Sequence, residues 1–264
     1  MGGAVTPVVA AIGTTHPYAA AGLLLDLAAI RILGAQPVAI VAGVSAQDAQ
    51  RVLARAPVDA ATIAAQFDAL DGTPIGAFCI GALLDAASVR AVAAGLGRYP
   101  GVPVICDPVI AASGGDRLAD DATIDALRAV LFARCTLLTP NLAEAALLTG
   151  ASIDDLAAMY AALPALLALG SAAVLLKGGH LEGDACDLFG DGRQLRELRA
   201  PRIPLDLRGT GSLLASAIAV RCAFGDALPV AIDVARTFVR ECIERGKSFA
   251  GMRIAFHGEA SARE

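Results

Sequence analysis

Tryptophan is absent from this sequence, and aromatic residues make up only 4% of it. The hydrophobic share is nevertheless 56%, so alanine, leucine and valine must fill the interior. Basic residues are also scarce, because 21 lysines and arginines stand against 26 acidic residues, a formal net charge of -5. This balance argues against nucleic acid or an anionic membrane surface as the main partner.

Signals for export, membrane insertion and metal-binding cysteines are missing as well. Residues 1–25 carry no formal charge, but no basic segment opens them, and Gly13, His16 and Pro17 interrupt the apolar run. No later window offers the roughly 20 apolar residues of a transmembrane helix. The six cysteines form no C-x-x-C pair, so we expect reduced thiols in a cytoplasmic protein.

The glycine pattern of dinucleotide-binding proteins, G-x-G-x-x-G, is missing where it is expected. After the first apolar run the sequence reads GTTHPYAAAG (13–22) instead. Binding of NAD or FAD is therefore disfavoured.

What the sequence does contain is an alternation of short apolar runs with longer segments of helical composition. The runs span 7–13, 37–44, 76–81, 103–110, 136–140 and 172–179. Helices are expected over 19–33, 86–96, 123–132, 153–169, 211–224 and 229–246. Continuously apolar runs are typical of parallel strands buried on both faces. We therefore predict a single α/β domain over 1–264, with a doubly wound, mostly parallel sheet. A Gly-Asp-Gly turn at 190–192 predicts an antiparallel hairpin at its edge.

Ligands of such sheets bind beyond the carboxyl ends of the strands, where Asp107 follows the fourth run. A carboxylate at this place can contact Mg²⁺ or a metal-bound water. Taken alone, the segment is equally consistent with an Asp-Pro turn and a surface ion pair.

Asn141 and Glu144 follow the fifth run, three residues apart at the start of a predicted helix. In isolation they are best interpreted as a capping box, whose cap is worth about 1 kcal/mol. They also share one face of the first turn, from which they could orient waters on Mg²⁺.

Lys177 ends the sixth run and precedes Gly178 and Gly179. A lysine followed by glycines suits a polyphosphate, because the backbone can approach it closely. In isolation, an exposed lysine before a tight turn is the somewhat better interpretation.

The stretch RGTGS (208–212) enters an apolar helix with glycine on both sides of Thr210. This pattern favours an anion-binding nest over a flexible helix entry capped by Ser212. Phosphoryl transfer needs a set of groups that this sequence contains in order. They are a carboxylate, a pair of residues that orients magnesium, a lysine and an anion-binding nest.

At this point the sequence resembles the hydroxymethylpyrimidine/phosphomethylpyrimidine kinases of thiamine biosynthesis, within the ribokinase-like superfamily that also includes pyridoxal kinases. The similar blocks are 107–118, 137–150, 174–192 and 208–219, and the resemblance runs over nearly the whole chain. It implies a three-layer α/β/α sandwich, with ATP and Mg²⁺ as cofactors. It also implies transfer of the γ-phosphoryl group to a hydroxymethyl group on a pyrimidine or on its monophosphate.

The resemblance assigns expected roles by position. Magnesium is expected at Asn141, Glu144 and Asp107. The expected catalytic residues are Ser212, Gly209, Thr210, Gly211 and Lys177. The expected cofactor contacts are Lys177, Gly178, Gly179, Asn141, Glu144, Thr210 and Gly211. The expected substrate contacts are Gly13, His16, Tyr18, Gly43 and Asp107.

The sequence departs from the family pattern mainly on the substrate side. The family's first loop carries an acidic residue where this chain has His16, and a Gln or Glu is frequent where it has Gly43. Ser212 stands where these kinases have cysteine and related kinases have aspartate, and Arg208 replaces a histidine. His16 and Tyr18 could supply replacement contacts or could be ordinary loop residues.

We therefore predict a cytoplasmic, ATP-dependent kinase that is slow, because Ser212 is a weak base without an activating neighbour. Ser212→Cys or Ser212→Asp is predicted to raise kcat. Two alternatives stay open, a pyridoxal-type kinase and a non-catalytic ligand-binding relative. A small molecule is the expected partner, and the resemblance also admits a homodimer.

Overall fold

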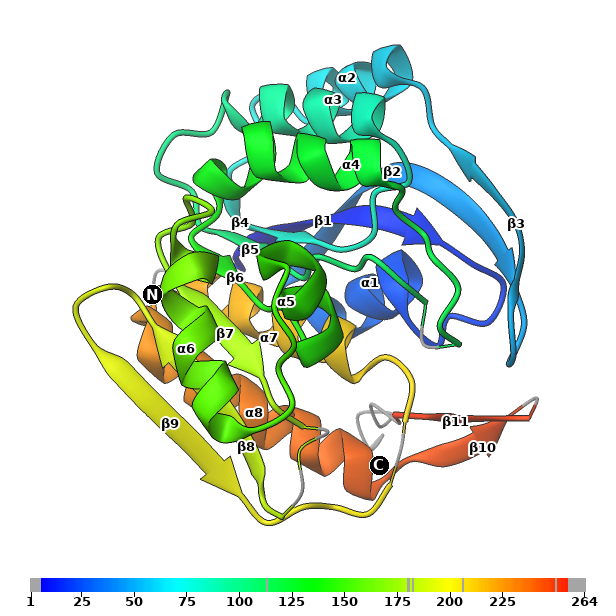
Figure 1. Cartoon of the computed structure of the whole chain (residues 1–264). Coiled ribbons are helices and arrows are strands. Elements are labelled where there is room, and N and C mark those ends of the chain that lie inside the picture. The colour runs from blue at the N-terminus through cyan, green and yellow to red at the C-terminus, as the bar shows by residue number, and fades with distance from the viewer. Residues whose placement is uncertain are drawn as a thin grey trace, which may run out of the picture.

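Nine strands form one sheet at the centre of the molecule in the computed structural model (Figure 1). The structure describes residues 6–112, 114–179, 181, 183–205, 207–249 and 251–255. The strands are β1 (Val8–Thr15), β2 (Gln36–Gln47), β3 (Val52–Pro57), β4 (Ile75–Ile80), β5 (Val104–Cys106), β6 (Leu137–Leu138), β7 (Val174–Lys177), β8 (Ala185–Gly190) and β9 (Leu195–Ala200). Their order in space is β3-β2-β1-β4-β5-β6-β7-β8-β9.

The middle of this sheet is parallel and both of its edges are antiparallel. Strand β1 pairs in parallel with β2 on one side and β4 on the other, and the parallel pairing continues to β7. Strands β3, β8 and β9 run antiparallel to their neighbours. Starting from β1, the chain adds β2 and β3 on one side and then β4 to β9 on the other. The predicted doubly wound sheet with an antiparallel edge is thus confirmed.

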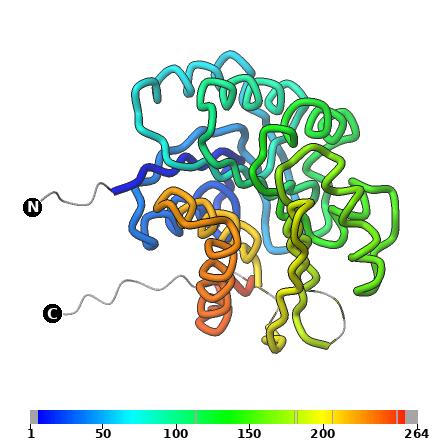
Figure 2. Tube along the Cα trace, turned by 90° about the vertical axis from the view of Figure 1, so that its left-hand side faces the viewer, coloured from blue at the N-terminus to red at the C-terminus, as the bar shows by residue number. Residues whose placement is uncertain are grey.

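Helices cover both faces of the sheet, which gives the expected three layers (Figures 1 and 2). One face carries α1 (Gly22–Ile32), α7 (Thr210–Ala223) and α8 (Leu228–Glu244). The other carries α2 (Ala60–Ala69), α3 (Ala86–Leu96), α4 (Asp121–Ala126), α5 (Leu142–Thr149) and α6 (Leu156–Leu167). Two apolar cores follow, one on each face, built mainly from aliphatic side chains as the composition predicts.

Some elements differ from the sequence-based expectation. Two apolar runs yield only short strands, because Pro108 and Pro140 follow β5 and β6 closely and cannot donate a ladder hydrogen bond. The helix expected over 123–132 changes after α4 into a π-turn (Leu127–Leu131) and a 3₁₀ turn (Phe132–Arg134). The expectation did not include α2, the mostly exposed β3, or a small hairpin of β10 (Lys247–Phe249) and β11 (Met252–Ile254).

The six cysteines are all free thiols, as expected. Within the described ranges, no helix combines the length and the apolarity needed to cross a membrane.

Candidate functional site

The carboxyl ends of β5 and β7 place Asp107 and Lys177 against each other. Lys177 Nζ donates a hydrogen bond of 2.7 Å to Asp107 Oδ1, and the side chains are only 16% and 7% exposed. Thr139, just after β6, donates to the same oxygen at 3.3 Å. The interpretation of Lys177 as a merely exposed lysine is therefore wrong, and Asp107 belongs to a buried ion pair.

Glu144 adds a second carboxyl group to this pair. Burial raises the pKa of Glu144 to about 7; the ammonium of Lys177 acts to lower it and the carboxylate of Asp107 to raise it. Burial opposes the charge on Lys177, but Asp107 and Glu144 outweigh it and raise the pKa of Lys177. The lysine is thus held as a cation near the end of β7.

The start of α7 presses against the same ion pair. Gly209 caps the helix in the left-handed conformation, with φ of 85°. A Cβ at Gly211 would lie 2.7 Å from Asp107 Oδ2 and 3.3 Å from Lys177 Nζ. Only glycine lets the helix N-terminus approach the pair this closely. Gly209, Thr210, Gly211, Asp107 and Lys177, predicted from separate motifs, are therefore brought together.

Ser212, in the first turn of α7, faces α1. Its Oγ accepts a hydrogen bond of 3.1 Å from the backbone N–H of Gly22. One turn further along both helices, Ser216 Oγ donates to Asp26 Oδ1 at 2.8 Å. These two contacts join the N-terminal end of α7 to α1, the helix that follows the first loop.

Asp26 was missed by the sequence analysis. Its side chain is buried in the apolar core of that face, and burial raises its pKa to about 7, an effect opposed by the Ser216 hydrogen bond and reinforced by Asp107. A lone carboxylate within the apolar helical run LLLDLAAI (23–30) was the signal that could have revealed it.

Asn141 and Glu144 form the capping box that their spacing predicts. The Glu144 N–H donates to Asn141 Oδ1 at 2.9 Å, and the Asn141 N–H donates to Glu144 Oε2 at 2.8 Å. In the part of the chain that the structure describes, no three His, Cys, Asp or Glu side chains gather as metal ligands would. The amide and carboxylate oxygens suit Mg²⁺ chemically, with water supplying most of its ligands.

A second buried ion pair, between Asp187 and Arg236, holds the backbone of the Lys177–Gly178 turn. The sequence did not predict this pair. Asp187 Oδ1 accepts from the N–H of Gly178 at 3.1 Å, and Asp187 Oδ2 accepts from Arg236 Nε at 2.9 Å. A Cβ at Gly178 would lie 2.2 Å from the carbonyl oxygen of Cys186, whereas one at Gly179 would meet nothing within 4 Å. Gly178 is thus required by packing.

Apart from Asp107, the predicted substrate contacts lie in or beside the first two strands: Gly13 in β1, Gly43 in β2, and His16 and Tyr18 in the loop after β1. Thr14 of β1 pairs with Gly43 of β2, so His16 follows directly beyond this point. A Cβ at Gly43 would lie 2.6 Å from Leu84 Cδ1, whereas one at Gly13 would make only ordinary contacts.

Tyr18 and Arg208 border this region on the side of the β10–β11 hairpin. The ring of Tyr18 meets Phe249 edge to face, with centroids 6.3 Å apart. The guanidinium of Arg208 donates to the carbonyl oxygens of Asp48 and Ala49 in the β2–β3 turn. Arg208 thereby fastens that turn to the entry of α7.

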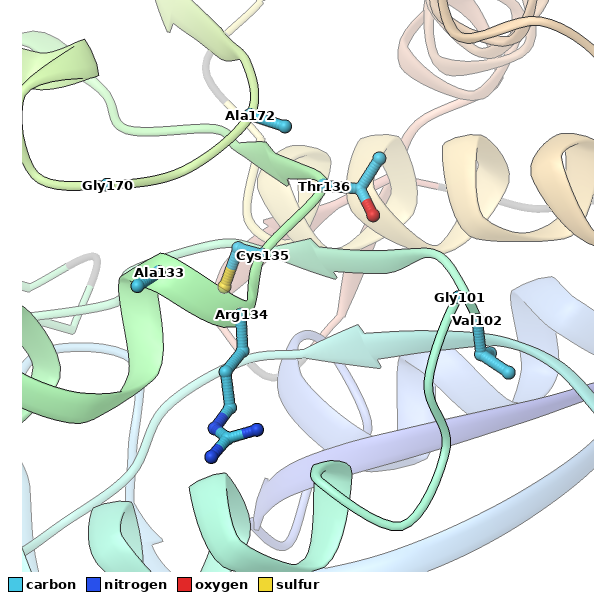
Figure 3. A pocket seen from close by; sticks show the side chains of 8 residues that line it. All are labelled: Gly101, Val102, Ala133, Arg134, Cys135, Thr136, Gly170 and Ala172. Atoms are coloured by element: carbon cyan, nitrogen blue, oxygen red, sulfur yellow. The ribbon is translucent and has the colours of Figure 1, made fainter.

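A hollow of about 310 Å³ lies elsewhere, at the amino ends of β5, β6 and β7 (Figure 3). Its lining includes Arg134, Cys135 and Thr136, which immediately precede β6. It is on the opposite edge of the parallel strands from the residues predicted to carry chemistry, so it is not the candidate site.

Sequence comparison relates the chain to kinases. The family model described as phosphomethylpyrimidine kinase matches residues 17–255. A hydroxymethylpyrimidine/phosphomethylpyrimidine kinase of Streptomyces coelicolor is 35% identical over 249 residues, which are 93% of this chain and 91% of that protein. One from Mycobacterium bovis is 37% identical over 247 residues, covering 91% of this chain and 90% of that protein.

Solved structures share the fold. An ADP complex of Bacillus subtilis pyridoxal kinase has a TM-score of 0.89 at 24% identity, covering 96% of this chain and 98% of that one. A phosphomethylpyrimidine kinase of Clostridium difficile has a TM-score of 0.79 at 24% identity, covering 90% of this chain and all of that one.

Proposed function

Because the chain belongs to the phosphomethylpyrimidine kinase family, we propose that it phosphorylates a hydroxymethylpyrimidine, or the monophosphate of one, with ATP. It is a phosphotransferase, and the observation that carries the proposal is the Asp107–Lys177 pair against the glycine entry of α7. Structural relatives solved in complex with ADP or AMP-PCP support ATP as the donor. The single domain over 1–264 and the homodimer stay predictions.

Charge neutralisation is the main task of such a site. Lys177, kept cationic by its carboxylate neighbours, has three N–H donors, of which Asp107 takes one. We assign Lys177 and the backbone N–H groups of 209–211 to the transferring phosphoryl group, whose charge spreads over three oxygens. A helix N-terminus adds a favourable field for the same anion.

Asn141 and Glu144 are assigned to Mg²⁺ through water molecules, because the capping box already uses one oxygen of each side chain. A bound Mg²⁺ would neutralise phosphate charge. The Asp107 carboxylate is committed to Lys177 and Thr139, so we assign it to holding the lysine. Gly178 and Gly179 are assigned to the nucleotide phosphates.

Transfer requires the acceptor oxygen to bond to the γ-phosphorus while the bond to the leaving ADP oxygen breaks, and the acceptor hydroxyl releases its proton to Ser212 or to water. Ser212 occupies the position from which a base would act, but its oxygen already accepts from Gly22. A serine hydroxyl is a weak base, so we expect slow turnover carried by positioning and charge.

The test is product formation by the purified chain with Mg-ATP and one acceptor at a time. Acceptors are hydroxymethylpyrimidine, its monophosphate and pyridoxal, and products are followed by mass spectrometry. We expect a mass gain of one phosphoryl group on the two pyrimidines and equimolar ADP. Phosphorylation of pyridoxal alone would replace the proposed acceptor, and binding without any transfer would identify a non-catalytic relative.

A further inference from the structure

Where β2 passes the end of β1, it offers the acceptor no side chain at position 43. Gly43 has no side chain, and a Cβ there would lie 2.6 Å from Leu84 Cδ1 and 3.2 Å from the carbonyl oxygen of Ala56. Leu84 therefore fills the space that a larger residue would need. At this level of the sheet, a side chain that recognises a polar ring must come from a neighbouring element.

The neighbouring strand end supplies a suitable group. His16 follows β1 directly and is only 7% exposed, yet neither of its ring nitrogens has a hydrogen-bond partner among the described residues. A buried polar group without a partner is destabilising, because it has lost its hydrogen bonds to water. Native structures leave few such groups, and a bound ligand is one way to satisfy them.

His16 also lies next to the machinery for phosphoryl transfer. A Cβ at Gly22 would lie 3.8 Å from His16 Cδ2, and the N–H of Gly22 donates to Ser212 Oγ. Gly22 thus lies beside the imidazole and is hydrogen-bonded to the first turn of α7. An acceptor placed for attack near α7 would therefore have His16 on its flank.

The charge state of the imidazole limits what it can recognise. Burial lowers the pKa of His16; the nearby backbone of Ala21 opposes this shift, and the Arg208 guanidinium lowers the pKa further. Near pH 7 the ring is neutral, with one N–H donor and one nitrogen acceptor. Such a ring matches a neutral heterocycle better than an ionised group.

We propose that His16 is the specificity-determining contact for the acceptor, hydrogen-bonding a ring nitrogen or amino group of a neutral heteroaromatic alcohol. This presupposes the proposed kinase activity and names the side chain that recognises its acceptor. His16 thereby supplies, from just beyond β1, the polar contact that Leu84 excludes at position 43 of β2.

The test compares His16→Leu, which removes both nitrogens, with the wild type. The KM for hydroxymethylpyrimidine should rise about tenfold or more, while the KM for ATP stays within twofold. The wild type should prefer the pyrimidine over its benzene-ring analogue, and His16→Leu should lose most of that preference. His16→Gln and His16→Asn keep an amide nitrogen and oxygen near the two ring nitrogens, so one of them should restore part of the affinity.

A matched control is available in Tyr99, whose hydroxyl is the other buried side-chain group without a partner among the described residues. Tyr99 packs on Phe78 ahead of the amino end of β5, away from the candidate site. Tyr99→Phe should leave both KM values unchanged. His16→Leu should not lower the melting temperature of the free protein, because the imidazole makes no hydrogen bond there.

The outcomes separate the two proposals. Wild-type turnover with an unchanged acceptor KM in His16→Leu overturns the role of His16 and leaves the kinase intact. A lower melting temperature together with an unchanged acceptor KM assigns His16 to structure instead. If the wild type binds hydroxymethylpyrimidine by calorimetry but transfers nothing, the kinase proposal fails, and the loss or retention of binding in His16→Leu decides the recognition role. No binding to the wild type overturns both.

Discussion

The phosphate side and the acceptor side of the candidate site are built in opposite ways. On the phosphate side, Lys177 is hydrogen-bonded to Asp107, and Asn141 is hydrogen-bonded to Glu144, before any ligand arrives. On the acceptor side, His16 is buried without a partner. Burying an unpaired charge has a large free-energy cost, so charged side chains are paired when they are buried. Burying a neutral imidazole without a hydrogen-bond partner costs less.

This difference suggests how one fold serves different acceptors. The phosphate side is constrained by glycines with no room for a side chain, such as Gly178 and Gly211. We assign the acceptor side to the loop after β1 and to position 43 of β2, where a single substitution changes the chemistry offered. On this proposal, reaction type and acceptor choice are separable properties of the chain.

Lys177→Met tests the phosphate side with the largest expected effect. It removes a charge directed at the transferring group, so kcat should fall about 10²–10³-fold. It also leaves Asp107 buried and unpaired, which should lower the free energy of unfolding by about 3–5 kcal/mol. Steady-state kinetics and urea unfolding measure the two effects.

The control is the double variant Lys177→Met with Asp107→Asn. It should recover most of the stability and none of the activity. Full activity in either variant would contradict a role for the lysine in transfer.

Gly211→Ala should come next. The added Cβ would lie 2.7 Å from Asp107 Oδ2, so either the ion pair or the start of α7 must move. A displacement of this kind can cost about 100-fold in turnover. The kcat of the folded variant is measured, with circular dichroism as the check on folding. Unchanged kcat would show that α7 does not need to approach the pair.

Ser212→Cys, unlike the two variants above, is expected to raise kcat. A thiolate is a far better proton acceptor than a serine hydroxyl, and a general base contributes about 10²–10⁴-fold in rate. We expect kcat to rise about tenfold, with Ser212→Asp behaving similarly and Ser212→Ala showing no gain. If both Cys and Asp variants are folded but no faster, residue 212 does not act as a base.

The smallest expected effect is on stability and concerns Asp26, which is buried between α1 and α7. Its pKa of about 7 in the folded protein lies above the ordinary value of 3.8, so folding takes up a proton. Stability from this group is fully present below about pH 4 and declines as the pH rises towards 7. Each pKa unit is worth about 1.4 kcal/mol, so the loss should be at least about 1 kcal/mol.

Asp26→Asn removes this titration. The free energy of unfolding of Asp26→Asn minus that of the wild type should therefore increase between pH 5 and pH 7.5. Glu144, whose pKa is also raised to about 7, titrates in both proteins and cancels in the difference. A difference that does not vary with pH would show that Asp26 is ionised throughout.

Much of this arrangement could be predicted from the sequence, because polar residues at strand ends stand out against apolar runs. Asp107, Lys177 and the glycines before α7 were expected at one edge of the sheet, and the structure brings them together. The capping box followed from spacing alone, since it depends on residues only three positions apart.

Long-range pairing could not be predicted. Asp187 and Arg236 are far apart in the chain and meet only because α8 packs beside β8 and β9. The contact between Gly22 and Ser212 depends on how α1 and α7 pack, which no local pattern encodes. The closure of the space at Gly43 by Leu84 is likewise a property of the folded chain.

The most direct measurement is the stoichiometry of transfer by the wild-type chain with Mg-ATP and hydroxymethylpyrimidine at pH 7.5. We expect one phosphorylated pyrimidine for each ADP formed, at a rate that Lys177→Met reduces at least 100-fold. Release of ADP with no phosphorylated pyrimidine, or equal rates in the wild type and Lys177→Met, would contradict the assignment of this site to phosphorylation of the acceptor.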